Sequence, residues 1–218
     1  MTDALFYELL TTDAITRSRC FSKFPQIENP VRIVGHIHRM LLHEQRTKTK
    51  ALDFLSYEVK ERFRFNLHLR DIGYELPPDA VQNTNEETAN IEGRVDRYRE
   101  RTNTVVSIFP EVTQGSDAAR LIALQEYEAA IAIPKNILSF YKSIGDPSLP
   151  PYDLLTGEWA TFRFFQINLL FSLHALHRHR GPIPATISPR EFTRLEHDVH
   201  DASLLATAVM AGGLATQE

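Results

Sequence analysis

The chain has little cysteine, no long apolar run and no excess of basic charge. Its one cysteine, Cys20, excludes a disulfide scaffold and a zinc cluster of thiolates. Its 24 basic residues stand against 28 acidic ones, so the formal net charge is −4. That balance argues against a protein that coats nucleic acid non-specifically, although a local basic patch is compatible with it. The most apolar stretch, residues 164–176, carries Gln166, Asn168 and His174 and is too short to cross a bilayer.

The start of the chain, Met1-Thr2-Asp3-Ala4, has neither the basic nor the apolar region of a signal peptide. The sequence contains no internal repeat and no low-complexity segment. Apolar residues make up 43% and charged residues 24% of the 218 residues, which are ordinary values for a globular protein. We therefore expect a folded, cytoplasmic protein without a membrane partner.

Helix signals dominate the chain. Ser116, Asn29-Pro30 and Ser188-Pro189 are typical helix starts, because Ser and Asn cap a helix and Pro suits its first turn. Gly181-Pro182 is a typical stop. The loops expected between helices include the polar run 82–88. Helices are expected over residues 4–12, 51–63, 86–102, 116–144 with a kink at Pro134, 157–180 and 201–212, with others beginning near residues 30 and 188.

The C-terminal end carries the clearest chemical pattern. Asp201 opens an apolar helix of small residues that ends at Gly212-Gly213, and residues 214–216 then have the pattern of a short strand before Glu218. A helix of ten residues spans about 15 Å, so a strand that packs back along it returns Glu218 to the level of Asp201. Carboxylates that meet in this way form an oxygen site suited to Mg²⁺ or Mn²⁺.

This segment resembles the C-terminal half of PIN domains, a family of metal-dependent nucleases that includes many toxins of bacterial toxin–antitoxin pairs. Asp201-Ala202 and residues 205–208 match the helix of the family's pattern, and Thr216-Gln217-Glu218 stands in place of its T-x-D. Residues 3–10 are similar to the helix that carries an early glutamate in the family, which corresponds to Glu8. The last acid here is Glu where the family has Asp.

The resemblance implies a mostly α protein with a split α/β PIN-like core. Residues 1–26 and 187–218 would form the two parts of that core, and residues 27–186 would be a large helical insertion. It also implies a divalent-metal-dependent ribonuclease, with a role as a toxin or defence effector. The partners to expect are then RNA, a protein partner such as an antitoxin, and a second copy of the chain.

In that interpretation Mg²⁺ or Mn²⁺ generates a hydroxide that hydrolyses a phosphodiester bond. The implied catalytic residues are Glu8, Asp201 and Glu218, which also bind the metal. Asp198 adds a fourth ligand if the helix extends back past Asp201.

Two other interpretations stay open. Asp201 could only cap a helix, with Glu8 and Glu218 solvated, which would leave a non-catalytic helical interaction or scaffold protein. Histidines also gather near two helices, as they do in DinB-like metal-binding helical bundles, to which the segment has a loose resemblance. That bundle would require one histidine of the first group to face one of the second, and these are His36 and His43, and His174 and His177.

Arginines line one face of the helix expected over residues 86–102. Arg94, Arg97 and Arg101 follow at i, i+3 and i+7 beside Tyr98, a pattern that can hold phosphates and stack bases of RNA. Acids alternate with these arginines, which favours a solvated, charge-paired face instead. The acids are Glu92, Asp96 and Glu100.

Overall fold

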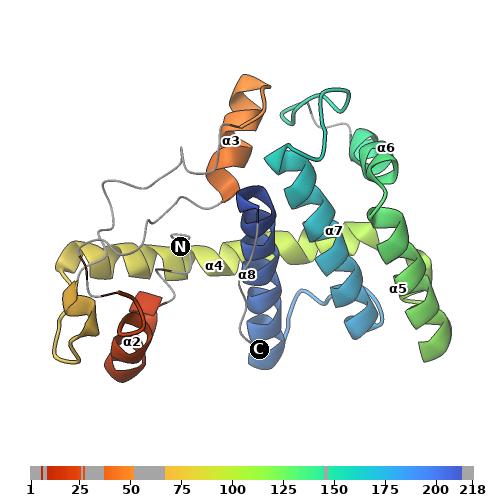
Figure 1. Ribbon diagram of the computed structural model, residues 1–218. Helices are drawn as coiled ribbons and strands as arrows, with labels where there is room; N and C mark the ends of the chain where they lie inside the picture. Colours follow the sequence, from red (N-terminus) through yellow and green to blue (C-terminus); the bar gives the residue numbers. More distant parts are fainter. Residues whose placement is uncertain are drawn as a thin grey trace.

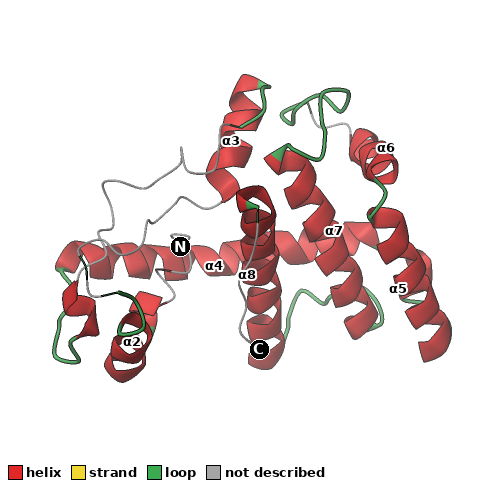
Figure 2. Cartoon of the chain, in the orientation of Figure 1, coloured by secondary structure: helices red, strands yellow, loops and turns green. Residues whose placement is uncertain are grey.

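A computed structural model describes residue 6 and residues 9–25, 27, 37–51, 67–144 and 147–212. Helices joined by turns make up this part of the chain, and it contains no strand (Figure 2). The mostly helical character is therefore confirmed, and the split α/β core implied by the resemblance to PIN domains is wrong for the described residues. Residues 214–216, expected to form a strand, lie outside them.

The long helix α4 runs across the back of α7 and α8, and α5 and α6 lie on the far side of α7 from α8 (Figure 1). The α-helices are α2 (Ala14–Phe21), α3 (Ile37–Thr47), α4 (Pro78–Val105), α5 (Asp117–Ile131), α6 (Pro134–Ile144), α7 (Ala160–His179) and α8 (Pro189–Ala211). Short 3-10 helices, η2 (Leu67–Arg70) and η3 (Pro110–Val112), lie before α4 and α5. Among the described helices, none combines the length and the apolar character that a membrane span requires.

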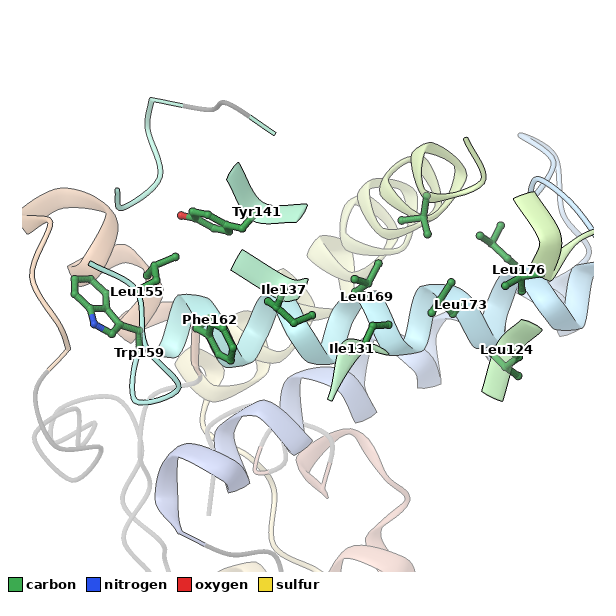
Figure 3. Close-up of a cluster of buried hydrophobic side chains, with 12 residues drawn as sticks. Leu124, Ile131, Ile137, Tyr141, Leu155, Trp159, Phe162, Leu169, Leu173 and Leu176 are labelled. Atoms are coloured by element: carbon green, nitrogen blue, oxygen red, sulfur yellow. The ribbon is translucent and has the colours of Figure 1, made fainter. Parts of the chain in front are cut away.

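Helix α7 is the central element of the core, because it is apolar on several faces and contacts α3, α4, α5, α6 and α8. Leu169 and Leu173 pack in one apolar cluster with Leu124 and Ile131 of α5 (Figure 3). Ala202 and Ala206 of α8 belong to a second cluster on the other flank of α7, where side chains of this size let the two helices approach closely.

Helix α8 is one continuous helix. The Ser188 hydroxyl accepts a hydrogen bond from the Glu191 amide at 3.2 Å, which confirms the expected capping site. The chain then stays helical until Gly212, whose φ of 85° ends the helix. The prediction that a helix starts at Asp201 is therefore wrong. Asp201 lies in the middle of α8 with its side chain exposed. An aspartate at such a position lowers the stability of a helix by less than about 1 kcal/mol, so the helix continues through it.

Two more boundaries differ from the expected ones. Residues 82–88 were expected to form a loop, but they belong to α4, which begins at Pro78. Within this polar stretch the Thr84 hydroxyl donates to the Ala80 carbonyl at 2.9 Å, so this polar side chain forms its hydrogen bond within the helix. The helix expected over 116–144 is divided into α5 and α6 immediately before Pro134, because proline cannot continue the ladder of hydrogen bonds.

Candidate anion-binding pocket

One stripe of α4 carries a row of polar side chains. Asn90, Arg94, Arg97 and Arg101 follow one another at intervals of four, three and four residues, so they share one face of the helix. They line a pocket of about 340 Å³ between α4 and the helices α3, α7 and α8. The arginines expected to bind nucleic acid therefore converge on one concave site.

The remaining walls of the pocket come from three other helices. His38 of α3 packs edge-on against Phe164 of α7, with the ring centroids 5.4 Å apart and the planes at 65°. Asn168 follows Phe164 by one turn, and Val199 and Ser203 of α8 are spaced in the same way. These pairs recur at i and i+4, the spacing that keeps two residues on one helix face. The pocket thus has an aromatic wall as well as a basic one.

The lining of the pocket contains three guanidinium groups and no carboxylate. Within the described part of the chain, Arg97 and Arg101 form no ion pair, and Asp96 pairs with Arg99 instead, at 3.1 Å. The pairing favoured by the alternation of charges is thus not formed by these two arginines. The Arg101 Nε–H group donates to the Arg97 carbonyl at 3.2 Å, which holds its side chain along α4.

The surroundings of Arg101 lower the pKa of its guanidinium. Removal of water from around the guanidinium lowers the pKa of Arg101, and the nearby charge of Arg97 lowers it further. Arginine stays protonated at neutral pH even so, because its ordinary pKa is far above that range. The ligand-free pocket therefore holds like charges close together, and an anion placed among them would relieve the repulsion.

Neutral hydrogen-bonding groups also line the pocket. The Asn168 Nδ2 group donates to the Phe164 carbonyl at 2.8 Å, which orients its amide. Ser203, which is 6% exposed, also lines the pocket. Planar guanidinium groups bind two oxygens of a phosphate or carboxylate at once, and amides and hydroxyls complete such sites. The pocket is thus chemically suited to an anion with several oxygens.

The acids expected to bind a metal do not form a cluster in the described residues. Asp198 lies one turn from Asp201 on α8, and its carboxylate pairs with the Arg178 guanidinium at 2.5 Å. No group of three or more His, Cys, Asp or Glu side chains with the arrangement of a metal site is found where the structure describes side chains. Glu8 and Glu218 lie outside the described residues, so their convergence on Asp201 stays a prediction.

The described histidines expected for a metal-binding bundle lie on two helices, His43 on α3 and His174 and His177 on α7. The Nε2 atom of His174 lies 2.6 Å from the Oε1 atom of Glu128. His43 precedes Glu44, whose carboxylate binds the first amides of α7, whereas His174 is fourteen residues further along that helix. Fourteen residues of helix span about 21 Å, so His43 and His174 lie too far apart for one ion. His36 lies outside the described residues.

Sequence reasoning missed most of the pocket's other residues. His38, Phe164, Asn168 and Ser203 carry no motif, and the one local signal was a polar residue inside an apolar helix, as at Asn168. Comparison of the chain with protein-family models, with curated proteins and with solved structures finds no match. The function of the chain must therefore be inferred from the chemistry of the pocket.

Proposed function

We propose that this protein binds RNA and that the pocket formed by Arg94, Arg97 and Arg101 holds the phosphate groups of the RNA. The observation that carries the proposal is the convergence of the three arginines on one pocket without a carboxylate in its lining. Phosphate contacts by arginine supply much of the affinity of proteins for nucleic acids. The aromatic pair of His38 and Phe164 supports the same ligand, because RNA also offers bases that stack on such rings.

The proposal is one of binding at a local site rather than along an extended surface. The net charge of −4 does not favour a surface that is basic over its whole area, so the contact should involve few phosphates. Hydrolysis is not included, because Asp198 is held by Arg178 and Asp201 is exposed in the middle of α8. The metal-dependent cleavage implied by the resemblance is a separate prediction that depends on Glu8 and Glu218.

The binding test uses fluorescence anisotropy with a short, labelled single-stranded RNA. Arg97→Gln and Arg101→Gln should each weaken binding about tenfold, because a hydrogen bond to a charged group contributes about 1.5 kcal/mol. The slope of log affinity against log salt should fall by about 0.7 for each phosphate contact that is lost. The matched control is Arg190→Gln, which removes an exposed arginine of α8 that does not line the pocket.

Two results would overturn the proposal. One is the absence of RNA binding by the folded wild-type protein at low salt. The other is an equal loss of affinity in Arg190→Gln, which would show that only net charge matters. The same RNA, incubated with Mg²⁺ or Mn²⁺, should stay intact in our proposal. Cleavage that disappears in Asp201→Asn would instead support the nuclease prediction.

A further inference from the structure

We propose that the pocket is a subsite for a single nucleotide, with its phosphate at the α4 arginines and its base against Phe164. This inference rests on the proposed function, because it uses the same arginines, and it adds the chemical identity of the group that fills the site. It predicts a specific preference: a ligand with both a phosphate and a base should bind better than a ligand with the phosphate alone.

The pocket has two kinds of wall. The α4 stripe offers three guanidinium groups and the amide of Asn90, which suit the oxygens of a phosphate. The α3–α7 wall offers the edge-to-face pair of His38 and Phe164. A bare phosphate or a sugar phosphate has no flat apolar face to place on that pair, whereas every nucleobase has one.

The size of the pocket fits one nucleotide better than a strand. Its volume of about 340 Å³ lies near the lower end of the range for small-molecule sites, which is about 300–1,000 Å³. Phe164 is half-buried, with one side of its surroundings formed by the apolar cluster of α3, α7 and α8. The ring is therefore held in place by packing while it contributes to the pocket lining, which is the condition for a preformed stacking surface.

Neutral groups complete the match to a nucleotide. Asn168 lies one helical turn beyond Phe164, and the buried Ser203 lines the same pocket from α8. An amide and a hydroxyl can both donate and accept, as the hydroxyls of a ribose and the edge of a base require. Each of the three components of a nucleotide thus has a chemically suitable counterpart in the lining.

The test is isothermal titration calorimetry of the full chain with the four nucleoside 5′-monophosphates, ribose 5-phosphate and inorganic phosphate. At least one nucleotide should bind about tenfold or more tightly than ribose 5-phosphate, because stacking of one base on an aromatic side chain contributes about 1–3 kcal/mol. Phe164→Leu should remove that difference and leave the affinity for ribose 5-phosphate unchanged. Arg97→Gln should weaken all of the phosphate-containing ligands.

The matched control is Phe165→Leu, which changes the neighbouring phenylalanine of α7. Phe165 packs on Phe140 and Tyr141, on the flank that faces α6, and does not line the pocket. It should lower the melting temperature and keep the preference for the nucleotide. A 5′-phosphorylated RNA trinucleotide, titrated in parallel, distinguishes a strand from a free nucleotide as the source of the bound group.

The outcomes separate this inference from the proposed function. If ribose 5-phosphate binds as tightly as the nucleotides and Phe164→Leu has no effect, the inference fails, while RNA binding through phosphates alone stands. If monophosphates bind with the expected dependence on Phe164 but RNA does not bind, the inference stands and the proposed function fails. If no phosphate ligand binds the folded protein, both fail.

Discussion

Two polar sites lie along the contact between α3 and α7, and they differ in how their charges are satisfied. At the start of α7, the carboxylate of Glu44 is 0% exposed and accepts hydrogen bonds from three backbone amides. These are the amides of Ala51 at 3.1 Å, Ala160 at 2.9 Å and Thr161 at 2.7 Å. One turn further along α7, Phe164 meets His38 of the same α3 in a pocket whose lining has cations and no carboxylate.

The first of these sites is a helix cap supplied from another helix. Trp159 occupies the N-cap position of α7, and its side chain makes no capping hydrogen bond. Glu44 does so in its place, with a negative charge at the positive end of the helix dipole. At the opposite end of α7 two arginines have carboxylate partners: Arg178 pairs with Asp198, and Arg180 pairs with Asp117 at 3.1 Å. The middle of α7 instead borders Arg97 and Arg101, which have no counter-ion among the described residues.

The Glu44 site should contribute mainly to stability, and the arginine pocket should contribute mainly to binding. A buried carboxylate that accepts three amides stabilises the fold and has little capacity left for a ligand. Arg97 and Arg101, which have no ion pair among the described residues, destabilise the fold slightly and keep their capacity for an anion. Substitutions at the two sites should therefore act on different measurements, so variants of each site can test that separation.

The largest effect is expected at Glu44. Glu44→Ala leaves three buried amides without their acceptor, and each costs about 1 kcal/mol or more, so the free energy of unfolding should fall by about 3 kcal/mol. Glu44→Gln should cost less, because the amide oxygen still accepts. Urea denaturation measures both variants, with the exposed Glu92→Ala as the control. A loss below about 1 kcal/mol in Glu44→Ala would show that the cap is not essential.

The second prediction concerns stabilisation by a ligand. At a concentration ten times its dissociation constant, a nucleotide that binds only the folded state should raise the free energy of unfolding by about 1.4 kcal/mol. The double variant Arg97→Gln and Arg101→Gln should lose this increase but fold normally, since neither residue belongs to an apolar cluster of the core. Urea denaturation of the wild type and the double variant, with and without the nucleotide, measures this increase in the free energy of unfolding. An equal increase in the double variant would place the ligand elsewhere.

The third prediction concerns the pH dependence of stability and His179, the last residue of α7. Burial lowers the pKa of His179 below its ordinary value of 6.5, although the Glu191 carboxylate, 3.4 Å away, opposes the shift. The unfolded chain therefore binds a proton at pH values where the folded protein does not. Stability contributed by neutral His179 is complete above pH 6.5 and falls as the pH drops below that value towards the folded-state pKa.

Substitution shows whether His179 causes that slope. The slope contributed by one proton is at most about 1.4 kcal/mol per pH unit, and His179→Gln should remove this part of it. Urea denaturation of the wild type and of His179→Gln, at a series of pH values below 6.5, measures how steeply the free energy of unfolding changes with pH. If the variant and the wild type keep the same slope, another group titrates on unfolding.

Features that depend only on residues close together in the sequence could be predicted from the sequence. The arginine stripe was predictable because Arg94, Arg97 and Arg101 lie on one helix, and the period of a helix alone brings them together. The start of α8 was predictable because Ser188 and Glu191 form a local capping pattern. Each of these signals needs only a few neighbouring residues, so no tertiary contact was required to interpret it.

Features that depend on tertiary contacts were not predictable. Glu44 and Ala160 are 116 residues apart, and a glutamate in a polar helix gives no sign of burial. His38 lines the same pocket as the arginines only because α3 packs on α7. Asp201 was interpreted as a helix start because it precedes an apolar segment, yet the capping signal at Ser188 had already begun that helix. The local pattern at Asp201 was thus overridden by a stronger one that lies nearer the N-terminus of the same helix.

The smallest expected effect is a gain in stability, and it tests the comparison most directly. Arg97 and Arg101 are like charges four residues apart on α4, an arrangement that destabilises a helix by about 0.2–0.5 kcal/mol. Arg97→Gln should therefore raise the free energy of unfolding of the ligand-free protein by that amount, and the gain should shrink as salt screens the repulsion. Arg46→Gln removes an exposed arginine in the last turn of α3, outside the pocket and with no lysine or arginine three or four residues away in that helix, and it should give no such gain. A decrease in stability with Arg97→Gln would mean that this guanidinium is satisfied within the fold as Glu44 is, and the middle of α7 would then be no better suited to an anion than its ends.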